Sequence, residues 1–331
     1  MDAASLAYFW AALIAFGILV YVVLDGFDLG VGILFGLTRD ERHRNQMMHA
    51  IAPFWDGNET WLILIGASLF GAFPAIYAIF LAAFYLPVLL LLFGLIFRGV
   101  AFEFRNRSLG RRWLWDWGFV LGSVVASFVQ GAAVGAMIEE LPVVDGRFAG
   151  HVLSWLSPFA VFCGIGLVFG YALLGATWLV HKTEGGLRDW AYRRIPWLLM
   201  GTLGFAAAAF LFTLDSHLRV ADQWQSRQWL LIFVAFGVIA VAGILAGVWL
   251  RRDELPFRAA AALFATAFAC LAGSFWPYML PYSVTIADAA APLASLEFLF
   301  YGAGLVVFPV VLAYTIGVYA IFRGKLHDGY E

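Results

Sequence analysis

The chain has 331 residues, of which 63% are hydrophobic and only 13% are charged. This composition excludes a soluble domain of this size. Repeated apolar runs of about 20 residues instead predict an all-α polytopic membrane protein. The formal net charge is −2, and the chain has no basic tract suited to nucleic acid.

We expect nine transmembrane helices in a single membrane domain that covers residues 1–331. The first apolar run follows Asp2 and is preceded by no Lys or Arg, which argues for a retained span and against a cleaved signal peptide. The expected spans cover approximately residues 6–28, 54–73, 75–97, 114–138, 156–180, 196–214, 229–250, 259–278 and 295–321.

The basic residues are distributed unevenly between the two sets of loops that these spans create. Of the 20 Lys and Arg residues, only Arg147, Arg219 and Arg227 fall in loops on the side that holds the N-terminus. Lys and Arg accumulate in cytoplasmic loops, so the asymmetry predicts a periplasmic N-terminus and a cytoplasmic C-terminus.

Four carboxylates lie near the ends of the first two expected spans. Asp25 and Asp28 are three residues apart, as are Asp56 and Glu59, so each pair shares one face of a helix. In the expected topology both pairs lie toward the cytoplasmic side, and Arg98 ends the third span at the same level. Ionisable residues at membrane depth are expensive, which makes this group a candidate functional site.

Glycines recur at helical spacing in the same region. Gly26 and Gly30 form one small-xxx-small pair, and Gly32 and Gly36 form another. Such pairs allow helix backbones to approach closely in a membrane. The sequence leaves open whether this contact is within the chain or with a partner chain.

Histidine, a common ligand of metals and haems, is absent from the interiors of the expected spans. All six histidines fall in loops or at span ends, and the chain has no CxxC motif. Cys163 and Cys270 lie in apolar runs, where packing is the simpler role. We therefore expect no metal site and no haem bound by this chain alone.

Two long motifs resemble the first-helix and second-helix signatures of subunit II of cytochrome bd-type quinol oxidases. The motifs are DGFDLGVG at residues 25–32 and IAPFWDGNETWL at residues 51–62. Shorter matches follow in order along essentially the whole chain, at residues 97–105, 115–118, 175–177, 182–185 and 276–281.

This resemblance implies a heterodimeric terminal oxidase in the bacterial cytoplasmic (inner) membrane. In the family, subunit I binds haems b and d, or b haems alone in a short cyanide-insensitive branch. Subunit I oxidises quinol, and oxygen is reduced to water with protons from the cytoplasm. Subunit II supports it without haem ligands and contributes to proton uptake. The resemblance also allows a quinone held by subunit II as a structural lipid, and a small single-span accessory subunit.

Under this interpretation no residue of the chain is catalytic, and Asp25 and Asp56 are the leading candidates for a proton route. Asp28 and Glu59 are weaker candidates. Arg98 is expected to pair with one acid, because an unpaired charge at that depth is costly. Two alternatives stay open: a proton- or ion-coupled transporter, and a purely structural partner whose acids only fix helix ends and the subunit seam.

Overall fold

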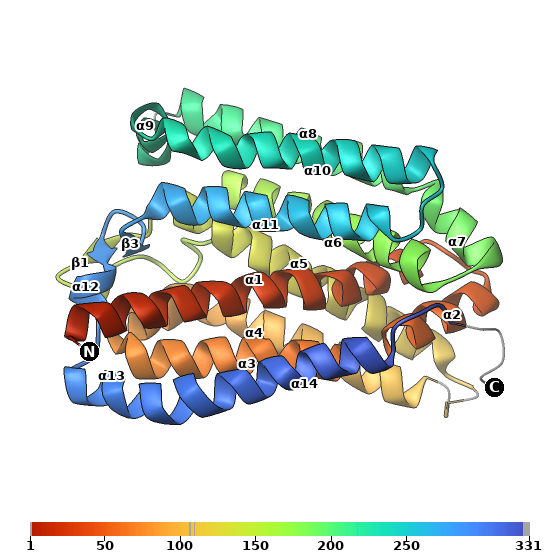
Figure 1. Cartoon of the computed structure of the whole chain (residues 1–331), viewed down its shortest axis with the longest axis horizontal. Helices are drawn as coiled ribbons and strands as arrows, with labels where there is room; N and C mark the ends of the chain where they lie inside the picture. The colour runs from red at the N-terminus through yellow and green to blue at the C-terminus, as the bar shows by residue number, and fades with distance from the viewer. Residues whose placement is uncertain (1, 106, 109, 217, 327–331) are drawn as a thin grey trace.

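Long helices lie side by side along one axis in the computed structural model, which describes residues 2–105, 107–108, 110–216 and 218–326 (Figure 1). The last long helix is continuous from α13 through a π-helical segment into α14. The long helices are α1 (Ala3–Phe35), α3 (Trp55–Ala72), α4 (Pro74–Phe104), α5 (Arg112–Ile138), α6 (Pro158–Lys182), α8 (Ile195–Asp215), α10 (Leu231–Trp249), α11 (Leu255–Phe275), α13 (Leu293–Leu299), η2 (Phe300–Val307) and α14 (Phe308–Ile321).

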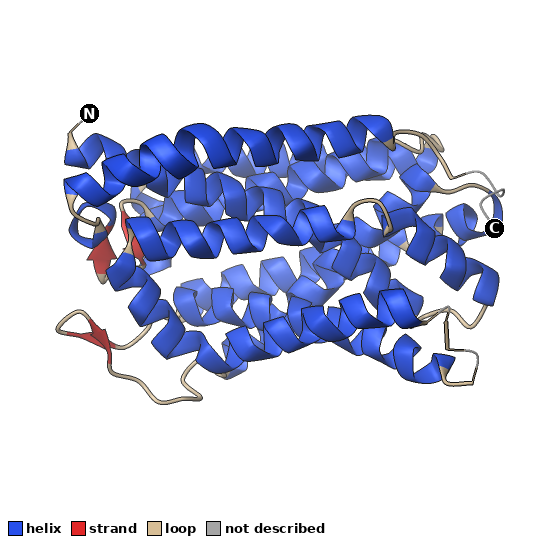
Figure 2. Ribbon diagram, turned by 90° about the horizontal axis from the view of Figure 1, so that it is seen from below, coloured by secondary structure: helices blue, strands red, loops and turns tan. Residues whose placement is uncertain are grey.

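Short elements join these helices at the two ends of the bundle; α1 begins at one end and α14 ends at the other (Figures 1 and 2). We call the end where α1 begins the hairpin end, because two antiparallel hairpins lie there, and the other the α2 end. The hairpin end has β1 (Val143–Val144), β2 (Arg147–Phe148), β3 (Tyr278–Leu280), β4 (Val284–Thr285), α9 (Arg219–Ser226) and α12 (Ile286–Ala289), and η1 (Gln228–Leu230) precedes α10. The α2 end has α2 (Glu41–Ile51) and α7 (Gly185–Tyr192).

Local sequence signals explain where several long helices begin. The Asp2 carboxylate accepts a hydrogen bond from the Ser5 amide at the start of α1, at 2.8 Å. At the start of α6, the Ser157 hydroxyl accepts one from the Ala160 amide at 2.9 Å, and Pro158 follows directly. A capping oxygen accepts a hydrogen bond from an amide that has no partner in the helix. Proline is tolerated in the first turn, because the N–H that it lacks would have no partner there.

Eight helical segments in the described part of the chain are long and apolar enough to cross a membrane. They include α7–α8, η1–α10 and α13–η2–α14, each counted as one segment. The expected span 54–73 corresponds to α3, which is not among the eight although it lies beside α1 and α14 in Figure 1. Asp56, Asn58 and Glu59 fall in the first turns of this 18-residue helix and make it less apolar.

Several expected boundaries differ from the structure: α1 and α4 extend to Phe35 and Phe104, beyond the expected ends at 28 and 97, whereas one span ends early. The span expected at 259–278 is α11, which ends at Phe275. The backbone leaves the helix at Trp276, directly before Pro277, and β3 begins at Tyr278. The residue before a proline is disfavoured in the helical conformation, which explains the earlier end.

Helix α1 approaches α5 and α6 closely because it carries glycines at the contacts. A Cβ at Gly30 would overlap the backbone carbonyl of Tyr171 on α6, and a Cβ at Gly26 would lie 2.8 Å from the Tyr171 ring. A Cβ at Gly32 would overlap the Ser123 side chain on α5. The structure therefore places these glycine contacts within the chain, around a central α1.

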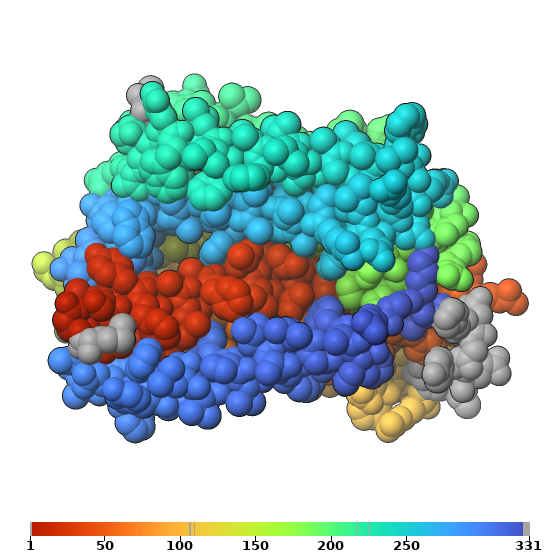
Figure 3. All heavy atoms as spheres, in the orientation of Figure 1, coloured from red at the N-terminus to blue at the C-terminus, as the bar shows by residue number. Residues whose placement is uncertain are grey.

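The outer helices present apolar side chains on their outer faces. On the face shown in Figure 3, α10 lies along one edge, with α11 between it and α1, and α14 lies along the other side of α1. Leu211 on α8, Ile239 on α10 and Ile316 on α14 are among the exposed apolar residues. Such faces suit contact with lipid or with another membrane chain.

Candidate functional site

A buried arginine joins three helices inside the bundle. The Arg98 guanidinium on α4 lies 3.0 Å from Asp25 Oδ1 on α1 and 2.7 Å from Glu59 Oε1 on α3. Arg98 and Asp25 are fully buried, whereas the Glu59 side chain retains 22% of its exposure. Glu59 is thus the member of this Arg98 cluster that reaches the surface of the chain.

The cluster lies deeper than the sequence suggested. Asp25 precedes the end of α1 at Phe35 by ten residues, which corresponds to about 15 Å along the helix. A guanidinium at such depth requires opposite charge close by, because removing one partner leaves a buried charge uncompensated at a cost of about 3–5 kcal/mol. Two carboxylates at one guanidinium meet this requirement.

Several atoms of the cluster are not used by these pairs. Asp25 Oδ2, Asp28 Oδ1 and Arg98 Nη1 are buried and have no hydrogen-bond partner among the described residues. Buried polar atoms of native proteins are normally paired, and exceptions concentrate at sites with a chemical role. These unpaired atoms make the cluster a candidate functional site.

A second polar group adjoins the first through α1 and α3. Asn58 Nδ2 donates to Asp28 Oδ2 at 2.7 Å and to the Leu24 carbonyl at 3.3 Å. The Tyr319 hydroxyl on α14 donates to Asn58 Oδ1 at 3.1 Å. Asp28 is fully buried, and Asn58 is its uncharged hydrogen-bond donor.

Uncharged polar side chains continue from the Arg98 cluster toward the middle of the bundle. Tyr21 precedes Asp25 by one turn on the same face of α1. Gln130 Nε2 on α5 donates to the Tyr21 hydroxyl at 3.2 Å, and the Tyr171 hydroxyl on α6 donates to Gln130 Oε1 at 2.8 Å. Sequence analysis missed this group; Gln130 inside an apolar run was the only signal.

The predicted acids do not all meet. Asp25, Glu59 and Arg98 come together, and Asp28 lies in the adjoining group, whereas the exposed Asp56 lies on the first turn of α3 outside both. Asp56 makes no ion pair within the described part of the chain. Sequence analysis also missed Asn58 and Tyr319 of the adjoining group, and neither residue carries a charge.

A second arginine network fastens the helices at the α2 end. The buried Arg105 lies 2.6 Å from Asp116 and 2.7 Å from Glu41, and its guanidinium lies over the Phe35 ring. Burial alone would raise the pKa of Glu41, but the hydrogen bonds and charges of Arg105 and Arg44 outweigh it and lower this pKa. The network ties α2 to α4 and α5.

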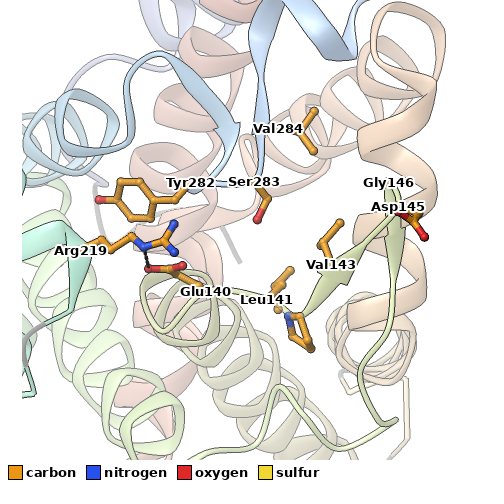
Figure 4. A pocket seen from close by; sticks show the side chains of 10 residues that line it. Glu140, Leu141, Val143, Asp145, Gly146, Arg219, Tyr282, Ser283 and Val284 are labelled. Carbon is orange, nitrogen blue, oxygen red and sulfur yellow. Dashed lines mark ion pairs between the residues drawn. The ribbon is translucent and has the colours of Figure 1, made fainter.

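Two hollows lie away from these clusters. A polar cavity of about 590 Å³ opens at the hairpin end, where Arg219 pairs with Glu140 at 3.6 Å beside Tyr282 (Figure 4). An apolar cavity of about 470 Å³ lies between α5, α6, α8 and α11, and Cys163 and Cys270 line it. Among the described residues, no three His, Cys, Asp or Glu side chains gather as metal ligands would.

These features define a helical membrane protein with a buried arginine–carboxylate cluster between three of its helices. The family described as "Cytochrome bd terminal oxidase subunit II" matches residues 6–322, and the chain belongs to this family.

Relatives with curated descriptions match over nearly the whole chain. The chain is 29% identical over 366 residues to "Cytochrome bd-I ubiquinol oxidase subunit 2" of Escherichia coli (strain K12), covering 98% of this chain and 96% of that protein. It is 30% identical over 335 residues to "Cytochrome bd ubiquinol oxidase subunit 2" of Bacillus subtilis (strain 168), covering 98% and 97%. A chain from "The structure of bd oxidase from Geobacillus thermodenitrificans" shares the fold, with a TM-score of 0.74, 11% identity and coverage of 98% and 99%.

The family membership confirms the resemblance seen in the two long motifs. It also confirms that the chain is a subunit of a terminal oxidase complex and a multi-pass protein of the bacterial inner membrane. Belonging to the subunit II family implies a complex with subunit I.

Proposed function

We propose that the chain is the non-haem subunit of a bd-type quinol oxidase. It supports subunit I, which oxidises quinol and reduces oxygen to water, and it supplies part of the route by which protons reach that reaction from the cytoplasm. The observation that carries this proposal is the buried Arg98 cluster, in which the fully buried Asp25 and the partly exposed Glu59 share one guanidinium, with the fully buried Asp28 in the adjoining group.

The proton route runs from the α2 end into the bundle. Glu59 takes a proton at the surface of the chain, and Asp25 Oδ2 receives it inside, because Oδ1 is held by Arg98. Tyr21 and Gln130 extend the polar path beyond Asp25 toward the middle of the bundle. Hydroxyl and carboxyl groups can each accept one proton while releasing another.

Asp56 and Asp28 have different places in this route. Asp56 is exposed on the first turn of α3, where it can gather protons from water or face subunit I. Asp28 is buried beside Asn58 and is the internal acid next to Asp25. We therefore rank Glu59, Asp25 and Asp28 above Asp56, which reverses the order that sequence position alone suggested for Glu59 and Asp56.

We further propose that α3 is a ninth transmembrane helix, that the whole chain is one membrane domain, and that the N-terminus is periplasmic. Helix α1 begins at one end of the bundle and α14 ends at the other, which supports an odd number of crossings (Figure 1). At the polar start of α3, Asn58 donates to Asp28 on α1 and Glu59 pairs with Arg98 on α4, so that these two side chains need not face lipid. Most basic loop residues lie at the α2 end, which is then cytoplasmic.

We assign the haems, whether b and d or b alone, to subunit I. This chain holds at most a quinone, as a structural lipid. The apolar cavity between α5, α6, α8 and α11 supports the quinone assignment, because its apolar lining matches an isoprenoid tail. The proposed partners are subunit I, quinol, lipid and a small single-span accessory subunit.

Purification of the complex from membranes tests the proposal. We expect a second membrane chain and haem absorbance to accompany this chain, and quinol to drive oxygen consumption by the complex. The chain expressed without its partner is expected to show no haem spectrum, since no histidine lies in the interior of its spans. A lone, colourless chain that transports ions into vesicles would overturn the assignment in favour of a coupled transporter.

A further inference from the structure

Lys182, the last residue of α6, holds the end of the last helix. It is 4% exposed, and its Nζ donates to the carbonyls of Phe322 at 2.5 Å and Gly324 at 3.1 Å, directly after α14. The Leu326 amide donates back to the Lys182 carbonyl at 2.8 Å. A lysine ammonium suits this place, because it carries three donors and the end of a helix carries partial negative charge.

The same ammonium lies against two aromatic rings. Lys182 Nζ is 5.1 Å from the centre of the Phe54 ring and 5.3 Å from that of the Trp178 ring. Trp178 is fixed in turn, because its indole N–H donates to the Ala50 carbonyl at 3.0 Å and its ring stacks on that of Phe27, with 4.0 Å between the ring centres. Cation–π contacts strengthen when they are shielded from water, so Lys182 is held firmly.

Tyr319 connects this arrangement to the buried acids. Tyr319 lies two residues before the end of α14. The centre of its ring is 4.7 Å from that of Phe54 and 6.1 Å from that of Trp178. Its hydroxyl donates to Asn58 Oδ1, which leaves the amide nitrogen of Asn58 to face Asp28. An amide rotated by half a turn would present an acceptor to the carboxylate. The Tyr319 hydroxyl, which donates to Oδ1, and the Leu24 carbonyl, which accepts from Nδ2 at 3.3 Å, together hold the amide nitrogen toward Asp28.

We propose that Lys182 is a positioning residue for proton uptake: by holding the end of α14 it fixes Tyr319, and through Asn58 it fixes the hydrogen bond to Asp28. This inference rests on the proposed function, because Asp28 matters to turnover only if the buried acids carry protons. Lys182 touches neither an acid nor the reacting atoms, and it acts only through the aromatic residues and α14.

The test uses the intact complex with subunit I and the variant Lys182→Met, which keeps an apolar stem of similar length and removes the donors. Lys182→Arg retains a cation with donors, and Arg251→Gln is the matched control, because Arg251 lies at the same end in an exposed pair with Asp189. Three quantities are measured: haem content, quinol-driven oxygen consumption, and the redox-induced infrared difference spectrum. Asp28→Asn identifies the carboxyl band of Asp28 as the band that it removes.

We expect Lys182→Met to retain its haem, to shift the Asp28 carboxyl band and to slow turnover by about tenfold, the effect of one hydrogen bond to a charged group. Lys182→Arg should restore both band and rate, and Arg251→Gln should change neither. An unshifted band with normal turnover in Lys182→Met would overturn the inference about Lys182 and would leave the proposed function standing.

The remaining outcomes are also decisive. If Lys182→Met does not assemble, Lys182→Gln, which keeps an amide donor, replaces it, and failure of both variants to assemble would show a folding role and overturn the inference. Normal turnover in Asp28→Asn would instead remove Asp28 from the proposed proton route. The positioning role would then fall with it, whatever the Lys182 variants do.

Discussion

The guanidinium of Arg98 and the carboxylate of Asp25 form an ion pair that is almost completely shielded, with 3.0 Å between Nη2 and Oδ1 and side-chain exposures of 2% and 1%. The pair joins α4 to α1 inside the bundle. Because Arg98 pairs with only one oxygen of Asp25, the other oxygen is not held by this ion pair. The same contact thus serves both the packing of the helices and the proposed chemistry.

Replacing Asp25 by Asn tests that chemistry with the smallest change of shape. We expect Asp25→Asn to assemble with full haem, since Glu59 still neutralises Arg98, and to slow quinol-driven oxygen consumption by roughly 10- to 100-fold. Asp56→Asn is the matched control and should have a smaller effect, because Asp56 lies outside the cluster. Equal turnover in the native complex and in Asp25→Asn would contradict the proton route.

Arg98 has the opposite charge and should behave differently. Arg98→Met leaves Asp25 and Glu59 without a cation, and the loss of one partner of a buried pair costs about 3–5 kcal/mol. We expect this variant to give little assembled complex, measured as haem recovered per membrane protein. The double variant in which Asp25→Asn is added should recover part of the yield, whereas no recovery would argue against mutual neutralisation.

Apolar runs and charge placement were sufficient to predict the class of fold, and the motifs at residues 25–32 and 51–62 carried the resemblance to the family. They also indicated that four acids and Arg98 lie toward one end of the bundle. The sequence could not show which acid of α3 faces inward, because Asp56 and Glu59 share a face and only packing sets the rotation of the helix. The structure turns Glu59 toward Arg98 and leaves Asp56 exposed.

Uncharged members of the site were beyond sequence reasoning for a different reason. Asn58 lies 261 residues from Tyr319 along the chain, and Tyr21 lies 109 residues from Gln130. No local periodicity links such distant residues, and tyrosines are common in membrane helices. Their roles became visible only through the hydrogen bonds that tertiary packing creates.

The close contact of α1 at Gly30 predicts that the cost of replacing a glycine by alanine depends strongly on which glycine is replaced. In Gly30→Ala the added methyl group would overlap the Tyr171 carbonyl on α6, so α1 and α6 must separate. We expect a clear loss of assembled complex, of the order of 1–3 kcal/mol in stability, as for other overpacked sites. Gly204→Ala on α8 is the control, because no atom lies within 4 Å of its added methyl group. Equal yields for the two variants would contradict the close α1–α6 contact.

The last prediction concerns acid stability at the α2 end, outside the spans. Asp253, in the loop between α10 and α11, forms an ion pair with Lys325 and accepts a hydrogen bond from the Tyr192 hydroxyl at 2.7 Å. Burial alone would raise the pKa of Asp253, but the hydrogen bonds from Lys325 and Tyr192 outweigh it and lower this pKa below its ordinary value. The ionised carboxylate therefore stabilises the folded chain.

Because the folded pKa of Asp253 is the lower one, this contribution is complete above the pKa of an unfolded-chain aspartate and is lost as the pH falls through the folded value. Thermal unfolding of the detergent-solubilised complex, followed from about pH 7 down to about pH 3, measures it. Asp253→Asn should be less stable than the native complex at the higher pH, and the difference should shrink toward the lower pH. The control Asp189→Asn, in a more exposed pair with Arg251, should show a smaller change. A difference between native and Asp253→Asn that stays constant over this range would show that Asp253 contributes through packing and not through its charge.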